Sequence, residues 1–338
     1  MTEHQFRHKG EFKLENGQSL HDIQISYHAA GNLNAAKDNV IWVCHALTAN
    51  SDVADWWPNM VGDGLLFDTS KYFIICANFL GSCYGTTGPL SKNPKTDQPY
   101  YHVFPLITIR DMVNAHDLLR DYLSISKIFM ITGGSIGGFQ ALEWSIMNPF
   151  LIENLVFIVS GAFASPWNIA INESQRLAIN ADHTFKENNE TAGSSGLKAA
   201  RSIALLSYRN AATYNKTQQD PEKDKLENYR AISYQQYQGE KLIKRFNAYS
   251  YYSITKSFDT HNVGRNRGGI ENALSGIISR SLLIAISSDI LFFPEEIREI
   301  QKNIPNSKFI EIDSLYGHDG FLIETEKLTK IINEFLDN

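Results

Sequence analysis

Short runs of apolar residues recur along the chain, separated by segments with helical periodicity. Several of these runs are apolar without interruption, which is typical of strands covered on both faces of a sheet. The strands predicted from them span residues 22–31, 39–46, 72–79, 127–133, 154–161, 281–288 and 308–313. Because strands alternate with helices, the pattern predicts an α/β fold with a mostly parallel sheet and helices on both faces.

Two of the segments between these strands have the features of amphipathic helices. In residues 108–123 the apolar side chains recur at helical spacing and charges fill the other positions. In residues 293–304, Pro294 stands where a first helical turn would begin, and two glutamates follow it near the positive helix end.

The strand pattern stops between residues 165 and 270. That stretch has long helix-like runs and two polar connectors, without a clear buried strand. Strand patterning returns at residue 281, so the sheet needs residues from both sides of the stretch. We therefore predict a core of residues 1–164 and 271–338, with residues 165–270 inserted as a helical lid.

Composition narrows the classes of function. The 338 residues are 43% hydrophobic and 20% charged, enough for one large domain with its own core. A net charge of −6 argues against nucleic-acid and anionic-membrane partners. No apolar run approaches the ~18 residues of a membrane span, and the N-terminus lacks the apolar region of a signal peptide. Three cysteines without zinc spacing suit a reducing compartment, so we expect a cytoplasmic enzyme without a metal.

The segment Gly133–Gly137 fits the G-x-S-x-G pattern of a serine nucleophile on a tight strand-to-helix turn. Such a turn would place the Ser135 hydroxyl at the carboxyl edge of the sheet and aim the Ile136 N–H at a developing oxyanion. A structural turn and a phosphate-binding turn are the alternatives. No Gly-Lys-Ser/Thr follows, and no acidic residue lies about 20 residues on at the end of a next strand, so the phosphate alternative is disfavoured.

A serine nucleophile needs a histidine base and an acid that orients the base. On this type of sheet the acid and then the histidine follow the serine in the chain. Asp289 comes directly after the predicted strand 281–288, and His318 lies in the loop after strand 308–313. Both therefore reach the edge that would carry Ser135.

Other acids and histidines fit less well. Asp313 ends the strand that precedes His318, and Asp319 is its sequence neighbour, so neither is as well placed as Asp289 to orient the ring. His183 lies in a polar connector, and His261, with Asp259 near it, lies in the insertion. Both histidines are expected to be surface or capping residues.

The loop after the predicted strand 39–46 should supply the second oxyanion donor. The backbone N–H of Leu47 is the candidate. His45 precedes Ser135, so we expect it to make a structural hydrogen bond near the strand end.

With these elements, the chain resembles the homoserine O-acetyltransferase family, which has the α/β-hydrolase fold. The segments that resemble family segments follow in order from about residue 20 to 325: CHALTAN, WWPNMVGDGLLFDTSKYFIICANFLGSCYGTTGPLSKNP, ITIRDMV, GGSIGGFQALEW, NESQRLAI, LFFPEE and YGHDGFLIE. Those containing CYGTTGP and YGHDGFL are specific to this family within the wider fold.

The resemblance implies transfer of the acetyl group of acetyl-CoA to the side-chain hydroxyl of L-homoserine, in methionine biosynthesis. It implies a ping-pong route through an acetyl-serine, with acetyl-CoA as co-substrate and no bound cofactor. It also places nucleophile, acid and base at Ser135, Asp289 and His318, in agreement with the reading of the residues.

The resemblance further implies that Arg201 and Asp319 hold the amino-acid substrate, with Tyr208 in the same role. A guanidinium suits the carboxylate of a zwitterion, and a carboxylate suits its ammonium. It also implies a homodimer joined through the lid helices.

The chain departs from the family pattern at Ala49 and Asn50, where the family usually has Gly-Asp, and at Gly320, where it has alanine. These departures leave a succinyl-CoA donor and an L-serine acceptor open. The same three residues would also serve an esterase or thioesterase, which spacing alone does not separate from a transferase. A non-catalytic binding module is disfavoured because the acid, base and nucleophile are all present.

Overall fold

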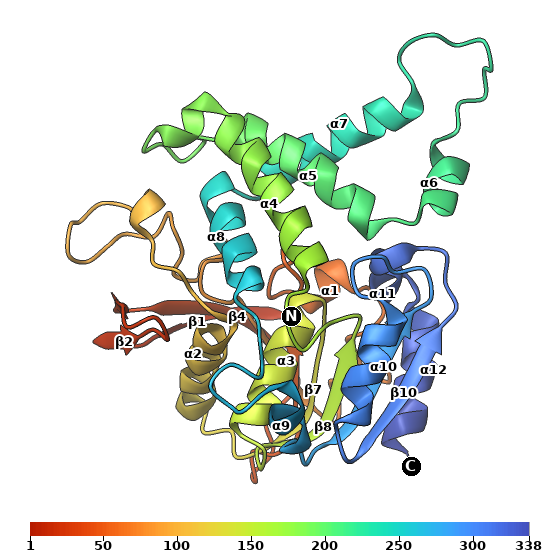
Figure 1. The fold of residues 1–338 in the computed structure, drawn as a ribbon. Helices are drawn as coiled ribbons and strands as arrows, with labels where there is room; N and C mark the ends of the chain where they lie inside the picture. The colour runs from red at the N-terminus through yellow and green to blue at the C-terminus, as the bar shows by residue number, and fades with distance from the viewer. Residues whose placement is uncertain (338) are drawn as a thin grey trace.

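The computed structural model describes residues 1–337, and in that part of the chain an eight-stranded sheet forms the centre of the molecule (Figure 1). The strand order is β1-β4-β6-β5-β7-β8-β9-β10. The pairs β1–β4 and β4–β6 are antiparallel, and every pair from β6 to β10 is parallel. The predicted mostly parallel sheet is confirmed.

The strands predicted from the apolar runs are all present. The sheet consists of β1 (Thr2–Arg7), β4 (Gln24–Ala30), β5 (Val40–Cys44), β6 (Phe73–Ala77), β7 (Ile128–Gly134), β8 (Ile152–Ile158), β9 (Arg280–Ile286) and β10 (Ser307–Ile312). Strand β1 was not predicted, and neither was the small sheet of β2 (Glu11–Lys13) and β3 (Ser19–His21). In β1 only Phe6 is buried, so this edge strand has no apolar run to reveal it.

Helices cover both faces of the sheet. One face carries α2 (Ile109–Tyr122), α3 (Ile136–Met147), α9 (Ile270–Ser275) and α10 (Pro294–Lys302), and the other carries α1 (Val53–Trp56) and α12 (Thr325–Leu336). Strand β5 contributes side chains to the hydrophobic core on both faces of the sheet. Trp42 packs on the face with α2 and α3, and Val43 packs on the face with α1 and α12. This alternation is the two-residue period of a strand buried on both sides. Helices α2 and α10 are the two predicted from periodicity.

A group of helices lies between β8 and β9 in the chain: α4 (Pro166–Ala181), α5 (Ser194–Tyr208), α6 (Ala211–Gln218), α7 (Arg230–Ile243) and α8 (Ala248–Asp259). They lie together beyond the end of the sheet, at the top of Figure 1. The first of them begins sharply because Ser165 and Asn168 form a reciprocal capping pair and Pro166 fills the first turn. No helix within residues 1–337 is long and apolar enough to cross a membrane.

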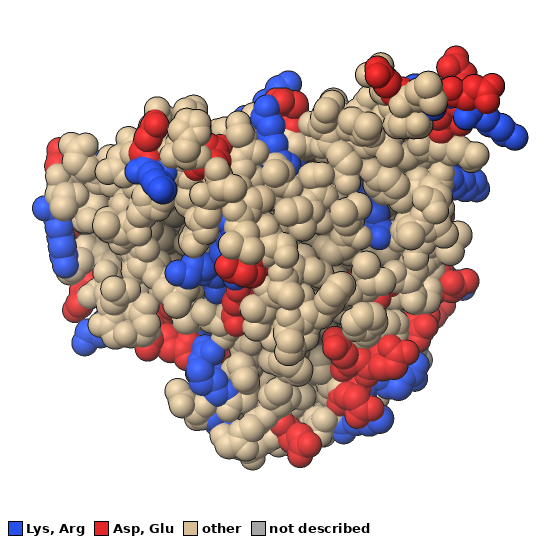
Figure 2. Space-filling view, turned by 45° about the horizontal axis from the view of Figure 1, so that its top comes forward, with Lys and Arg blue, Asp and Glu red and all other residues tan. Residues whose placement is uncertain are grey.

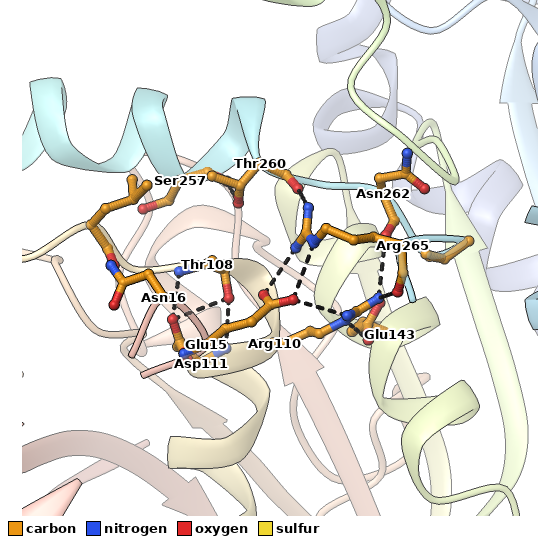
Figure 3. Close-up of polar contacts among 12 residues, drawn as sticks. Glu15, Asn16, Thr108, Arg110, Asp111, Glu143, Ser257, Thr260, Asn262 and Arg265 are labelled. Atoms are coloured by element: carbon orange, nitrogen blue, oxygen red, sulfur yellow. Dashed lines mark hydrogen bonds and ion pairs between the residues drawn. The ribbon is translucent and has the colours of Figure 1, made fainter. Parts of the chain in front are cut away.

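An ionic network ties the chain returning from α8 to the core (Figure 3). Arg110 on α2 binds Glu143 on α3 (Nε–Oε1 2.9 Å) and Glu15 (Nη1–Oε1 2.9 Å). From the returning chain, Arg265 binds Glu15 at 2.9 Å and Arg267 binds Glu143 at 2.5 Å. Because Glu143 is buried on the helix that follows the serine turn, the network connects that helix to the base of the helical group.

We predict that Glu143→Gln lowers stability. The substitution removes the one negative charge that Arg110 and Arg267 share, while Arg110 keeps its ion pair with Glu15. We expect the free energy of unfolding in urea to fall by about 1–3 kcal/mol, since the arginines stay partly solvated. Glu311→Gln is the control, because its ion pair with Arg298 is exposed and such pairs contribute about 0–1 kcal/mol. Equal stability of the two variants would contradict a stabilising role for the network.

Candidate active site

Ser135 stands between β7 and α3 in an uncommon backbone conformation. Its φ is 59° and its ψ is −128°, a region that non-glycine residues rarely adopt. The Ser135 N–H donates to the Ile158 carbonyl at 3.2 Å, and the Ser160 hydroxyl donates to the Ser135 carbonyl at 2.6 Å. These bonds to the neighbouring strand and its loop hold the turn in place.

The turn also depends on close packing at Gly137. A Cβ atom at this position would lie 2.2 Å from the carbonyl oxygen of Cys44, the last residue of β5. No side chain fits in that space without moving α3 away from the sheet. Glycine is therefore required here by the approach of helix to strand, as the G-x-S-x-G pattern predicts.

Asp289 and His318 are in direct contact. The Nδ1 atom of His318 lies 2.7 Å from Oδ2 of Asp289, and both residues are buried. The other carboxylate oxygen accepts the N–H groups of Leu291 at 2.7 Å and Phe292 at 3.1 Å. With Nδ1–H donating to the fixed carboxylate, Nε2 is the ring atom left to accept a proton.

A cavity of about 580 Å³ is lined by six of the predicted site residues, and Asp289 and Ile136 lie outside its lining. This volume is typical of a small-molecule site. Its lining includes Leu47, Ala49, Asn50, Ser135, Arg201, Tyr208, Lys241, Arg245, His318 and Asp319. A cavity of similar size, lined by Tyr72 and Phe150 among others, holds none of the predicted residues.

The two predicted oxyanion donors come from the loop after β5 and from the start of α3. Ile136 is the first residue of α3, so its N–H has no acceptor within the helix. Leu47 follows β5 and lines the same cavity as Ser135. Both positions suit backbone donors to an oxygen near the serine hydroxyl.

The three predicted substrate-binding residues all line the cavity. Arg201 and Tyr208 stand two turns apart on one face of α5, with the guanidinium carbon 5.8 Å from the tyrosine ring centroid. The Tyr208 ring centroid lies 5.8 Å from that of His318. Burial raises the pKa of Asp319, opposed first by Arg209 and then by His318 and Arg201.

Two further arginines at the site were not predicted. Nε of Arg209 lies 3.0 Å from Oδ2 of Asp319, and Arg245 lines the cavity while donating to the Thr48 carbonyl at 2.5 Å. Asp319 is far from Arg209 in the sequence, and Thr48 is far from Arg245, so only the tertiary fold reveals these contacts. The adjacency of Arg209 to Tyr208 in the SYRN segment was the single clue available.

The other histidines have structural surroundings. His45 is buried, with Nδ1 2.9 Å from the next residue's carbonyl, and burial lowers its pKa to about 4. His183 is exposed. The expectation of a surface or capping position for His261 is wrong. Its ring is buried, stacks on Phe139 with centroids 3.8 Å apart, and lies 3.0 Å from the Gly161 carbonyl.

The rival acids have other partners. Asp313 is exposed and accepts a hydrogen bond from Ser287 at 3.2 Å. Asp259 pairs with Arg176 at 2.6 Å.

In residues 1–337 no group of three or more His, Cys, Asp or Glu side chains is placed to hold a metal ion. The departures Ala49 and Asn50 line the cavity, and buried Gly320 lies outside its lining.

The fold defines an α/β hydrolase. A family model described as alpha/beta hydrolase fold matches residues 39–325. The crystal structure of homoserine O-acetyltransferase from Bacillus anthracis superposes with a TM-score of 0.94 at 24% identity, covering 100% of this chain and 98% of that one. The esterase E22 L374D mutant superposes with a TM-score of 0.91 at 24% identity, covering 100% of both. At this identity the likeness shows the fold alone.

Sequence relatives define the family within that fold. Homoserine O-acetyltransferase from Cyclobacterium marinum is 47% identical over 335 residues, which are 99% of this chain and 95% of that protein. The protein of the same name from Chlorobaculum tepidum is 41% identical, over 99% of this chain and 94% of that one. The chain belongs to the homoserine O-acetyltransferase family, as its sequence segments predicted.

We predict that Gly137→Ala displaces the serine turn. A methyl group 2.2 Å from the Cys44 carbonyl oxygen forces α3 away from β5 and carries Ser135 with it. We expect a loss of at least ~10²-fold in CoA-releasing activity, because a misplacement of about 1 Å has that effect. Gly276→Ala is the matched control, since its added Cβ meets the nearest atom at an ordinary 3.5 Å. Full activity of the Gly137 variant would show that the close packing does not position the serine.

Proposed function

We propose that this protein transfers the acetyl group of acetyl-CoA to the side-chain hydroxyl of L-homoserine in methionine biosynthesis. The observation that carries the proposal is the 2.7 Å contact of Asp289 with His318, which lines the same cavity as Ser135. The names of the full-length relatives point to the same acceptor and the same acyl group.

In the first half-reaction, Nε2 of His318 takes the proton of the Ser135 hydroxyl as Oγ attacks the thioester carbonyl carbon. The backbone N–H groups of Leu47 and Ile136 bind the oxyanion. Loss of one such donor typically reduces the rate by ~10²–10³. The carbon–sulfur bond then breaks, and the imidazolium of His318 gives its proton to the departing CoA thiolate. Asp289 stabilises that imidazolium.

In the second half-reaction, His318 takes the proton of the homoserine hydroxyl as this oxygen attacks acetyl-Ser135. The ester bond to Oγ breaks, and the proton returns to Ser135. The Arg201 guanidinium would bind the carboxylate of homoserine, and the Asp319 carboxylate would bind its ammonium group. Tyr208 lines the same cavity as these two residues. No group outside the chain and its two substrates is needed to balance either step.

We infer that residues 165–270 act as a lid over a core of residues 1–164 and 271–338. Residues of α5 and α7 supply cavity walls opposite the sheet: Arg201, Tyr208 and Lys241. A lid of this kind limits water, which competes with homoserine for the acetyl-serine.

We also infer a cytoplasmic homodimer joined through this lid. Helices α4, α5 and α7 expose the apolar side chains Leu177, Leu206 and Ile232. Figure 2 shows the lid side with large uncharged areas and charges of both signs mainly around the margin. Such a surface suits an interface between two copies.

We predict that CoA release from acetyl-CoA depends on L-homoserine. Release is followed with a thiol reagent for acetyl-CoA and succinyl-CoA, each with homoserine, L-serine or water. We expect acetyl-CoA with homoserine to be fastest, and parallel double-reciprocal lines for the two substrates. Equal release without homoserine would instead identify a hydrolase, and intersecting lines would argue against the acetyl-serine.

We predict that Ser135→Ala and His318→Ala each lower kcat by ~10⁴-fold or more, because these residues act as a unit. Each variant should keep the unfolding midpoint of the wild type to within a few degrees. Substantial turnover by a folded Ser135→Ala protein would remove the serine from the mechanism.

A further inference from the structure

The end of helix α5 is packed against the loop that carries His318. A Cβ at Gly317, where φ is 64°, would lie 2.8 Å from the Asn210 N atom and 3.0 Å from the Tyr208 carbonyl oxygen. The Thr213 hydroxyl donates to the Leu315 carbonyl of the same loop. The helical group and the histidine loop are therefore held in one fixed arrangement.

Arg209 adds an ion pair to this contact. Its Nε atom lies 3.0 Å from Oδ2 of Asp319, with the arginine side chain 30% exposed and the aspartate side chain 16% exposed. Asp319 lines the cavity, whereas Arg209 is absent from its lining. The guanidinium thus approaches the carboxylate from outside the cavity and leaves the cavity side open to another cation.

The charge state of Asp319 depends on this neighbour. Burial raises the pKa of the carboxyl group, and the Arg209 guanidinium is the strongest opposing influence, ahead of His318 and Arg201. The Asp289 carboxylate acts in the same direction as burial. A carboxyl group receives an ammonium ion well only when it is ionised, so the arginine favours the binding form.

We propose that Arg209 is a positioning residue for the acceptor: it anchors the Asp319 carboxylate facing the cavity and thereby sets the affinity for the ammonium group of the amino-acid substrate. The proposal rests on the proposed function, because it concerns the second half-reaction. The first half-reaction needs Ser135, His318 and the oxyanion donors, none of which Arg209 contacts in the described structure.

The test compares kcat/KM for the two substrates in Arg209→Gln. We expect kcat/KM for homoserine to fall about tenfold or more, mainly through KM, because the ion pair that holds the Asp319 carboxylate is lost. The value for acetyl-CoA should stay within about twofold of the wild type. Arg209→Lys should restore part of the homoserine value by returning the positive charge. Arg120→Gln is the matched control, a partly exposed arginine paired with Asp117 on α2.

The pH dependence of kcat/KM in the Arg209→Gln variant distinguishes positioning of Asp319 from general damage to the structure. Without Arg209 the pKa of Asp319 should rise, so the acidic limb of kcat/KM for homoserine should move to higher pH or become steeper. The acidic limb for acetyl-CoA should not move, because the first half-reaction does not use Asp319. Equal displacement of both limbs would indicate damage to the histidine loop and overturn the proposal.

A double-mutant cycle tests whether the arginine acts through the aspartate. If it does, Arg209→Gln combined with Asp319→Asn should be no worse for homoserine than Asp319→Asn alone. Fully additive losses would show that Arg209 acts independently of Asp319 and overturn the positioning role. A wild-type protein without homoserine-dependent turnover would overturn the proposed function as well, whereas active wild type with an unchanged Arg209→Gln variant would overturn only the role of Arg209.

Discussion

The geometry of the site depends on how closely helix α3 approaches strand β5. Gly137 lets the helix backbone come within a distance of the Cys44 carbonyl that excludes any side chain. Because the helix starts so close to the sheet, Ser135 must turn from strand to helix in a single residue, at φ 59°. Such strain persists only where the surroundings fix it, and here the bonds to Ile158 and Ser160 do so.

Asp289 and His318 reach the same point through the register of two parallel strands. Ile286 of β9 pairs with Ile312 of β10, so both strands end together at the edge of the sheet where Ser135 stands. Asp289 lies in the short turn that follows β9. Its carboxylate stabilises this turn by accepting hydrogen bonds from the N–H groups of Leu291 and Phe292. The register of the sheet therefore brings the acid and the base to one edge.

These two constraints explain what was predictable from sequence. Buried parallel strands have uninterrupted apolar runs, and parallel strands bring their carboxyl ends to one edge, so the grouping of Ser135, Asp289 and His318 could be inferred. Strand β1 was missed because it is mostly exposed, and His261 was misplaced because sequence does not show the Phe139 ring that covers it. The contact of Arg209 with Asp319 joins an inserted helix to a core loop, which no local pattern encodes.

In the proposed mechanism, the division between sheet and helical group separates chemistry from substrate recognition. The serine, acid and base stand on the sheet, while Arg201, Lys241 and Arg245 reach the cavity from the inserted segment. His318 and Asp319 are adjacent residues that belong to different sides of this division. His318 contacts Asp289 at the sheet edge, and Asp319 pairs with Arg209 at the end of α5. A shift of the helical group relative to this loop would thus alter the Asp319 carboxylate. The ion pairs of Arg265 and Arg267 with Glu15 and Glu143 oppose such a shift from the other end of the helical group.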